Sequence, residues 1–89
     1  MNETVRLRDE LIEWREIDGE IVALDRGAGE YLAVTGSGAM LWPLLVAGTT
    51  TAALAGALTA RFDIEHATAG RDVERFVAAL TARGLVERR

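Results

Sequence analysis

Few side chains in this sequence have the chemistry of a catalyst or a metal ligand. The chain contains one histidine, His66, and no cysteine, which excludes disulfides, thiolate metal sites and cysteine nucleophiles. Asp63 and Glu65 lie near His66 in the sequence, but a metal site or a general base needs several groups that converge. A lone histidine at the start of a predicted helix is typical of an exposed residue. We therefore expect no metal, no cofactor and no catalytic residue.

A serine lies between two glycines at positions 36–38, as in the turn that carries a hydrolase nucleophile. The hydrolase motif is longer, follows a strand of a large α/β sheet and needs a later histidine. Ser37, or Thr35 before it, is better explained as the cap of a helix. The other glycines fit neither the phosphate-loop nor the dinucleotide spacing, and turn chemistry explains them. The sequence therefore predicts a protein that is not an enzyme.

Charge is distributed unevenly along the 89 residues. All ten basic residues are arginines, fourteen residues are acidic, and residues 1–30 hold nine of the acids against four arginines. A net charge of −4 does not favour binding to nucleic acid, which depends on neutralising phosphates. No apolar run approaches the ~18 residues of a membrane span, and the charged N-terminal segment lacks a signal-peptide core. We expect a cytoplasmic protein that binds neither nucleic acid nor membranes.

Three arginines lie on the last predicted helix: Arg71, Arg75 and Arg83. Arginines on one helix are typical of a DNA-recognition helix. Asp72 and Glu74 interrupt this basic surface, and mixed charges suit a solvated helix face equally well. A winged-helix DNA-binding regulator therefore stays open as an alternative function.

The first half of the chain predicts three antiparallel strands. Runs of strand-forming residues cover positions 11–17, 20–25 and 30–34. Asp18 and Gly19, between the first two runs, form the dipeptide that a type I′ hairpin turn prefers. This turn pairs Ile17 with Glu20, and it places Trp14 opposite Ala23.

Alternation along these strands predicts two different faces of the sheet. We expect the core-facing side to carry Val22, Leu24, Leu32 and Val34. We expect the opposite face to carry Trp14, Ile21, Ala23, Tyr31 and Ala33. Because this second face is too apolar to be solvated, either a loop or the N-terminal segment covers it, or it binds a partner.

The second half of the chain predicts three helices, near residues 38–46, 51–62 and 67–83. Leu54, Leu58 and Phe62 form the expected buried stripe of the second helix. The stripe of the third consists of Val73, Phe76, Val77 and Leu80. Gly84 suits a left-handed residue after that helix, and Leu85 then packs back on its last turn. Residues 1–89 thus predict one α+β domain, a three-stranded antiparallel sheet followed by a three-helix bundle (βββααα, winged-helix-like).

The third strand, residues 30–34, raises a question that the pattern leaves open. In a three-stranded meander an outer strand has unpaired backbone groups, and proteins usually protect such an edge with proline, lysine or a bulge. Only Glu30 could serve this purpose here. If the free edge lies beside the third helix, an extended peptide can add as a fourth strand. If the strand is central, or if a chain terminus covers its edge, a peptide cannot.

Short motifs in a fixed order carry a family resemblance. They are residues 18–25 (DGEIVALD), 31–34 (YLAV), 35–39 (TGSGA) with Leu41 and Trp42, 48–50 (GTT), 60–63 (ARFD), Asp72 and Val73 with Phe76, and Leu80 with Gly84 and Leu85. This series, over about residues 5–87, resembles the coenzyme PQQ synthesis protein D (PqqD) family. The resemblance implies a βββααα fold that recognises ribosomally made, post-translationally modified peptides (RiPPs).

The resemblance also implies a site and partners. The leader segment of a precursor peptide adds as a strand between the third strand and the third helix. The protein then presents the precursor to a modifying enzyme, such as a radical SAM enzyme, or to a leader peptidase in a lasso-peptide pathway. The implied ladder and first wall are Glu30, Tyr31, Leu32, Ala33 and Val34, and the implied helical wall is Asp72, Arg75, Phe76, Ala79 and Arg83. Phe76 also belongs to the predicted core stripe.

Two further alternatives stay open. The chain could be a non-catalytic small subunit of an enzyme complex, bound through the apolar face that includes Trp14, Ile21 and Tyr31. It could also form a homodimer. A monomer with that face covered would argue against the subunit.

Overall fold

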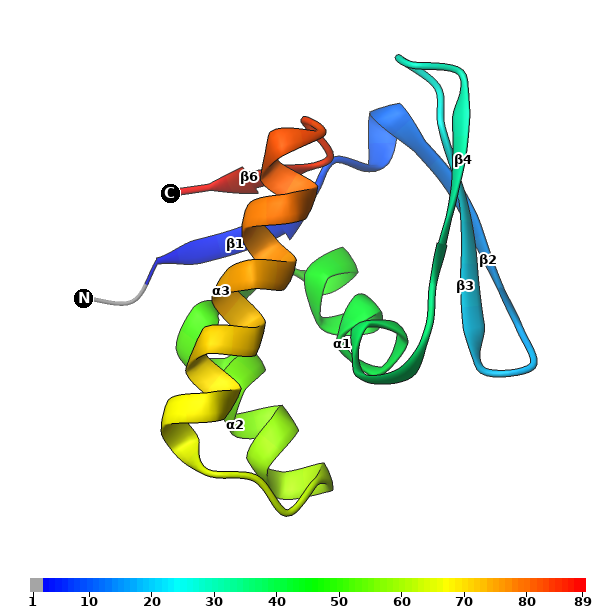
Figure 1. Cartoon of the computed structure of the whole chain (residues 1–89). Helices are drawn as coiled ribbons and strands as arrows, with labels where there is room; N and C mark the ends of the chain where they lie inside the picture. Colours follow the sequence, from blue (N-terminus) through cyan, green and yellow to red (C-terminus); the bar gives the residue numbers. More distant parts are fainter. Residues whose placement is uncertain (1–2) are drawn as a thin grey trace.

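The computed structural model describes residues 3–89, which form two small antiparallel sheets and three helices (Figure 1). One sheet has the strand order β2-β3-β4 and the other β5-β1-β6. In chain order the elements are β1 (Thr4–Leu7), the 3-10 helix η1 (Asp9–Leu11), β2 (Ile12–Ile17), β3 (Glu20–Asp25), β4 (Glu30–Val34), α1 (Gly36–Ala47), β5 (Thr49–Thr50), α2 (Thr51–Arg61), α3 (His66–Ala82) and β6 (Val86–Arg88). The predicted α+β class, the three-stranded meander and the three following helices are confirmed.

The hairpin between β2 and β3 forms as the sequence predicts. Asp18 has a φ of 52° and Gly19 a φ of 80°, and a type I′ turn needs positive φ at both positions. Ile17 pairs with Glu20, and Trp14 lies opposite Ala23. The predicted register of this hairpin is therefore correct.

The predicted faces of β3 are wrong. Ile21 and Ala23 are buried, whereas Val22 and Leu24 are only partly buried on the other side of the sheet. The loop of residues 26–29 sets a register in which Ala23 pairs with Leu32. Odd-numbered residues of β3 therefore share a face with even-numbered residues of β4. Because side chains alternate with a period of two, an error of one residue moves every side chain to the opposite face.

The side of the β2-β3-β4 sheet away from the helices is called the outer face below. It carries Glu13, Arg15, Ile17, Glu20, Val22, Leu24, Tyr31 and Ala33. The sequence correctly placed Leu32 and Val34 on the core side and Tyr31 and Ala33 opposite them. Trp14 packs edge-on against the buried Trp42, with 6.1 Å between ring centroids, so it lies on the core side. The predicted apolar face that combined Trp14, Ile21 and Tyr31 does not exist.

The second sheet, β5-β1-β6, is absent from the sequence-based prediction. It joins the two ends of the described chain, with Val5 opposite Arg88 in the register of β1 and β6, and these ends lie together in Figure 1. The Arg88 guanidinium donates hydrogen bonds to Glu3 and to Glu74 of α3, which raise the pKa of Arg88. β1 and β6 lie apart from the β2-β3-β4 sheet in Figure 1, so neither of them covers it.

Helix caps at α2 and after α3 follow their local sequence, whereas the predicted cap of α1 does not. Thr50 Oγ1 accepts a hydrogen bond of 3.0 Å from the Ala53 amide and caps α2. After α3, Gly84 has a φ of 74° and the Leu85 amide donates to the Leu80 carbonyl at 3.0 Å, as a glycine-ended helix requires. Thr35 occupies the N-cap position of α1, but its side chain makes no capping hydrogen bond.

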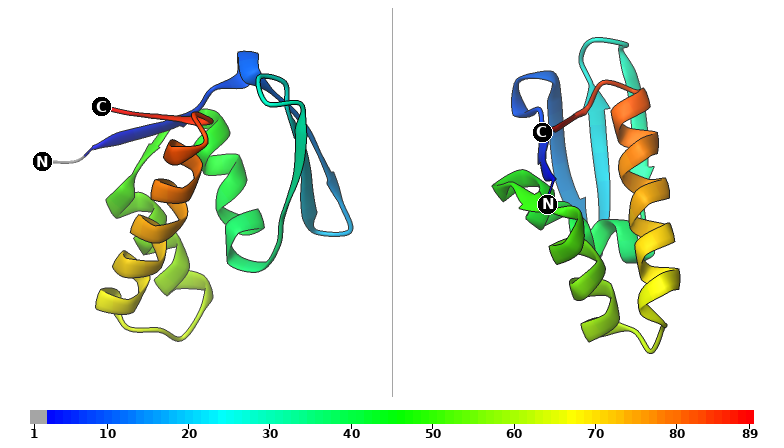
Figure 2. Two further views of the ribbon diagram at one scale, coloured as in Figure 1. Left: turned by 45° about the horizontal axis from the view of Figure 1, so that its top comes forward. Right: turned by 90° about the vertical axis from the view of Figure 1, so that its left-hand side faces the viewer.

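The core forms where α1 lies between the sheet and the other two helices (Figure 2). Trp42 of α1 is fully buried. The predicted stripes of α2 and α3 are confirmed for Leu54, Leu58, Val73, Val77 and Leu80. Phe62 was predicted in the core but is 40% exposed, because α2 ends at Arg61 and the chain turns away there.

Candidate functional site

β4 is an edge strand. It pairs with β3 alone, and its other edge is unpaired. Among residues 3–89, Glu30–Val34 make no backbone hydrogen bond outside the ladder with β3. The question that the sequence left open therefore has an answer: the strand is not central, and no described terminus covers it.

Hydrogen-bond alternation shows which backbone groups of β4 point to the free edge. In a two-residue hairpin the closing pair, here Ile17 and Glu20, exchanges both hydrogen bonds, so Glu20 and every second residue after it on β3 bond to β2. The intervening residues of β3 bond to β4. Their register partners are Glu30, Leu32 and Val34. Tyr31 and Ala33 are left with N–H and C=O groups directed away from β3.

One stripe of α3 faces β4. Its members follow helical spacing and are Asp72, Phe76, Ala79 and Arg83. At one end, Arg83 Nη2 lies 3.8 Å from Glu30 Oε1. At the other end, Asp72 lines a hollow with Gly36 and Ser37, which follow β4 in the chain. β4 and α3 therefore run in opposite directions, and the strip of surface between them is called the β4–α3 seam below.

Phe76 lies at the floor of the seam. A β-carbon on Gly38 of α1 would lie 2.8 Å from Val34 Cγ1 and 3.0 Å from Phe76 Cε1, so the strand, α1 and α3 meet here with no spare space. Leu32 and Phe76 are both half-buried and pack against the core. The middle of the seam is thus apolar, and Ala79, the next member of the stripe, has the smallest side chain in it.

The predicted site residues all lie on β4 or along α3, but they do not form one surface, because the side chains of Tyr31 and Ala33 lie on the outer face, away from the helices. Glu30, Tyr31 and Ala33 are exposed on β4, whereas Leu32 is half-buried and Val34 is buried. The helical set Asp72, Ala79 and Arg83 is exposed along the stripe. Arg75, one residue before Phe76, is exposed and has no ion pair among residues 3–89, in contrast to Arg83.

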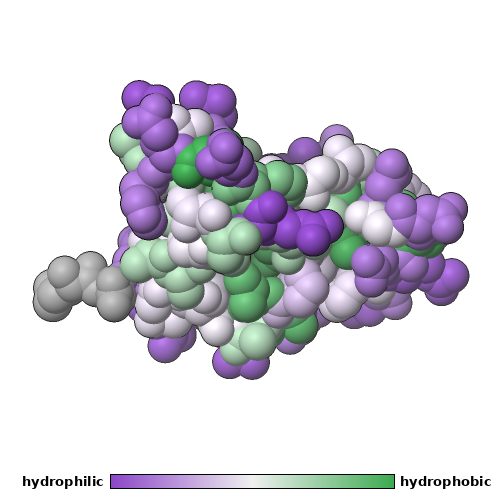
Figure 3. Space-filling view, turned by 90° about the horizontal axis from the view of Figure 1, so that it is seen from below, coloured by the Kyte–Doolittle hydropathy of each residue, from purple (hydrophilic) through white to green (hydrophobic). Residues whose placement is uncertain are grey.

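Sequence reasoning missed a hollow at one end of the β4–α3 seam. A hollow of about 330 Å³ lies where β4 leads into α1, and it is lined by Gly36, Ser37, Leu58, Phe62, Ile64 and Asp72. Figure 3 views the molecule from this end and shows apolar surface gathered in its middle. The hollow continues the apolar seam past the end of β4. The predicted helix stripe places Phe62 in the core. Its position in the lining of the hollow could have been predicted only if the last residue of α2 were known.

The residues considered for catalysis form no catalytic arrangement. His66 is exposed at the start of α3, and residues 3–89 contain no cluster of three or more groups that could hold a metal ion. Ser37 lies in the first turn of α1. None of the helices between residues 3 and 89 has the length and apolar character needed to cross a membrane.

Known proteins with a similar sequence or fold agree with this geometry. A family described as coenzyme PQQ synthesis protein D (PqqD) matches residues 20–86. The fold is similar to that of TbiB1 in complex with the TbiA(beta) leader peptide, at 28% identity and a TM-score of 0.85, covering 92% of this chain and 94% of that one. It is also similar to lasso peptide synthetase B1 complexed with the leader peptide, at 30% identity and a TM-score of 0.81, covering 93% and 96%. A search of curated proteins finds no match.

Proposed function

Because this chain belongs to the coenzyme PQQ synthesis protein D family, we propose that it binds the leader segment of a ribosomally made precursor peptide. The observation that carries this proposal is the unpaired edge of β4 opposite an apolar stripe of α3. Both similar structures are described as complexes with a leader peptide. Binding, rather than catalysis, is the role of the chain.

The leader adds to β4 as a fourth strand of the β2-β3-β4 sheet. The N–H and C=O groups of Tyr31 and Ala33 supply its hydrogen bonds. Each such bond contributes about 0.5–1.5 kcal/mol net, and main-chain bonds fix the register of the peptide without reading its sequence.

Side chains of the leader supply the selectivity. Alternate side chains of an added strand point into the seam, where Leu32, Val34 and Phe76 form an apolar floor. Past the end of β4, the hollow beside Phe62 accepts one further apolar side chain. Truncating an apolar leader residue that fills either place costs more than about 1 kcal/mol of binding free energy if it is a hot spot.

An acidic leader residue pairs with an arginine of α3. Arg75 is the better candidate than Arg83, because Glu30 already lies 3.8 Å from the Arg83 guanidinium. Arg75→Glu weakens binding, and exchanging the matching leader acid for arginine restores it. Failure of every such exchange to restore binding contradicts the pair.

The bound precursor is presented to a modifying enzyme, such as a radical SAM enzyme, or to a leader peptidase. We place this step in the cytoplasm, where ribosomes make the precursor, and assign the chain no cofactor of its own. A DNA-binding role has little support from α3, because acidic Asp72 lies in its exposed stripe and Glu74 binds Arg88.

The test is fluorescence anisotropy with labelled leader peptides from short reading frames beside the gene. We expect saturable binding at sub-micromolar concentration that is lost when the leader sequence is scrambled. A labelled DNA duplex serves as the control. Salt-dependent binding of the duplex, without binding of any leader, contradicts the proposal and favours the regulator.

A further inference from the structure

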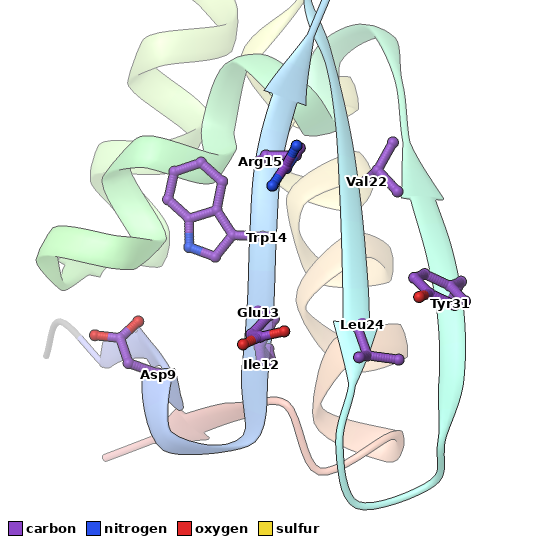
Figure 4. Close-up of a pocket in the computed structure, with 8 residues that line it drawn as sticks. All are labelled: Asp9, Ile12, Glu13, Trp14, Arg15, Val22, Leu24 and Tyr31. Carbon is purple, nitrogen blue, oxygen red and sulfur yellow. The ribbon is translucent and has the colours of Figure 1, made fainter.

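The outer face of the β2-β3-β4 sheet has no layer over it in the part of the chain that the structure describes. Figure 4 looks onto this face, with the helices behind the sheet. Ile17 is 49% exposed and Tyr31 is 74% exposed, and Val22 and Leu24 line an open hollow of about 670 Å³. The solvated face of an antiparallel sheet is normally polar. This apolar face is therefore a candidate interaction surface, and the order of its residues indicates which partner fits it.

The strand register arranges the side chains of the outer face in rows that run across the sheet. Successive rows lie two residues apart along each strand, which is about 7 Å. In order, they are Glu13-Leu24-Tyr31, Arg15-Val22-Ala33 and Ile17-Glu20. Arg26 follows Leu24 at the same spacing and lies before the first row, where its Nη2 is 2.7 Å from Glu13 Oε1. Acidic and basic side chains therefore alternate along the face.

A second copy of the chain matches these rows. We consider a two-fold axis that runs parallel to the rows, between the first and the second. It lays each strand over its own copy in the opposite direction, so the first row of one chain faces the second row of the other. The facing pairs are Glu13 with Arg15, Leu24 with Val22, and Tyr31 with Ala33. Opposite charges, two apolar side chains, and a large with a small side chain thus meet in one register.

The charges favour this axis over two others. Arg15 has no ion pair among residues 3–89, and here it gains Glu13 of the second copy. Along β3, the same axis sets Glu20 against Arg26 of the second copy. An axis through the second row sets Arg15 against Arg15, and an axis parallel to the strands covers Arg15 with Ala33. Both of these leave a covered charge unpaired, which is costly.

We propose that the outer face is the interface of a symmetric homodimer, in which Glu13 and Arg15 of each copy pair with Arg15 and Glu13 of the other. Face-to-face packing of two antiparallel sheets is a common arrangement. A face about 20 Å long and 15 Å wide is smaller than the roughly 800 Å² per partner of a standard interface, so the dimer is weak. The free edge of β4 stays open beside the interface, and dimerisation therefore does not depend on a leader.

Sedimentation equilibrium of the full chain, without any leader, tests the inference between about 10 and 500 μM, the range of weak association. The wild type is expected to change from monomer to dimer as its concentration rises. Arg15→Glu and Glu13→Arg each set like charges against each other and are expected to weaken self-association at least about tenfold. An equimolar mixture of the two variants restores opposite charges, and its affinity is expected to lie within about threefold of the wild type. Arg61→Glu, at the end of α2, is the control and is expected to dimerise like the wild type.

The outcomes decide the inference without reference to leader binding, which anisotropy measures separately on the dilute chain. A wild type that stays monomeric throughout overturns the inference, as does a dimer that neither variant weakens. A mixture that does not associate shows that Glu13 and Arg15 are not partners and also overturns it. If circular dichroism shows a variant to be unfolded, NMR of the wild type on dilution replaces it. The amide signals of Ile17, Val22 and Ala33 are then expected to shift, and shifts confined to the helices contradict the proposed interface.

Discussion

The two sheets of this protein have three strands each but differ in strand length and surroundings. In β5-β1-β6 the strands have two to four residues, join the ends of the described chain, and are connected to α3 through Arg88 and Glu74. In β2-β3-β4 the strands have five or six residues, and among residues 3–89 no strand pairs with the β4 edge beside α3 and no layer covers the outer face. The comparison teaches that stability and binding are separable here. The first sheet joins the two ends of the described chain, and the second offers the free strand edge to which the leader is proposed to bind.

The largest expected effect comes from blocking the free edge of β4. Ala33→Pro removes an N–H directed to that edge and places a ring where the leader strand must approach. Leader affinity is expected to fall at least about tenfold, which corresponds to about 1.4 kcal/mol. Because this N–H does not bond to β3, the fold is retained. Anisotropy measures the affinity and circular dichroism the fold.

Ala33→Val is the matched control, because it adds side-chain volume but keeps the N–H. Its leader affinity is expected to stay within about threefold of the wild type, by the modest size of exposed-site changes. If the proline variant is folded and binds as well as the valine variant, the leader binds elsewhere.

Gly38→Ala tests the floor of the seam. The new β-carbon lies too close to Val34 and Phe76, and overpacking of this kind costs about 1–3 kcal/mol of folding free energy. Phe76 moves toward the seam, so leader affinity falls as well. Denaturant unfolding and anisotropy measure the two losses on the same protein.

Gly56→Ala is the counterpart in α2, where an added β-carbon meets nothing within 4 Å. Removing a helix-interior glycine there is expected to stabilise the protein by up to about 1 kcal/mol, with leader affinity unchanged. Equal effects of the two substitutions on stability and on binding would show that the crowding at Gly38 has no consequence.

Arg88→Met tests the division of roles from the side of the first sheet. It removes the hydrogen bonds to Glu3 and Glu74 and is expected to lower stability by about 1 kcal/mol, with a melting temperature about 4–8 °C lower. Leader affinity at 25 °C is expected to stay the same. Arg89→Met, at a far more exposed arginine, serves as the control. A loss of leader affinity in Arg88→Met but not in Arg89→Met would show that leader binding depends on the β5-β1-β6 sheet.

Glu30→Gln has the smallest expected effect. It releases Arg83 from an exposed ion pair of the kind that contributes at most about 1 kcal/mol. A leader with an acidic residue at this end of the seam is expected to bind up to about twofold more tightly, and the gain disappears at high salt. A gain that persists in high salt would have a different cause.

The sequence predicted most of what lies between residues 11 and 34 and most of the helices. Asp18 and Gly19 set a turn whose geometry has few solutions, and Leu54, Leu58, Val73 and Leu80 follow a period that only a packed helix explains. The wrong predictions concern places where a shift of one residue along the chain changes which side chains are buried. The length of the 26–29 loop determines which face Val22 occupies, and the last turn of α2 determines whether Phe62 is buried.

The β5-β1-β6 sheet could not be predicted from the sequence for a different reason. β1, β5 and β6 are too short for alternation to be recognised, and their pairing joins segments from both ends of the chain. The site was partly predictable, because the strand and the helix stripe each have a local pattern. Their pairing across the seam, seen in Glu30 with Arg83 and Val34 with Phe76, depends on the position of α1 between them.

The most direct test of the central claim is amide hydrogen exchange, measured residue by residue by NMR with and without a bound leader. The account predicts fast exchange at Tyr31 and Ala33 in the free protein and strong protection of these two amides in the complex. Leu32, whose amide already bonds to β3, is protected in both states. A saturated complex in which Tyr31 and Ala33 still exchange fast would contradict strand addition at β4.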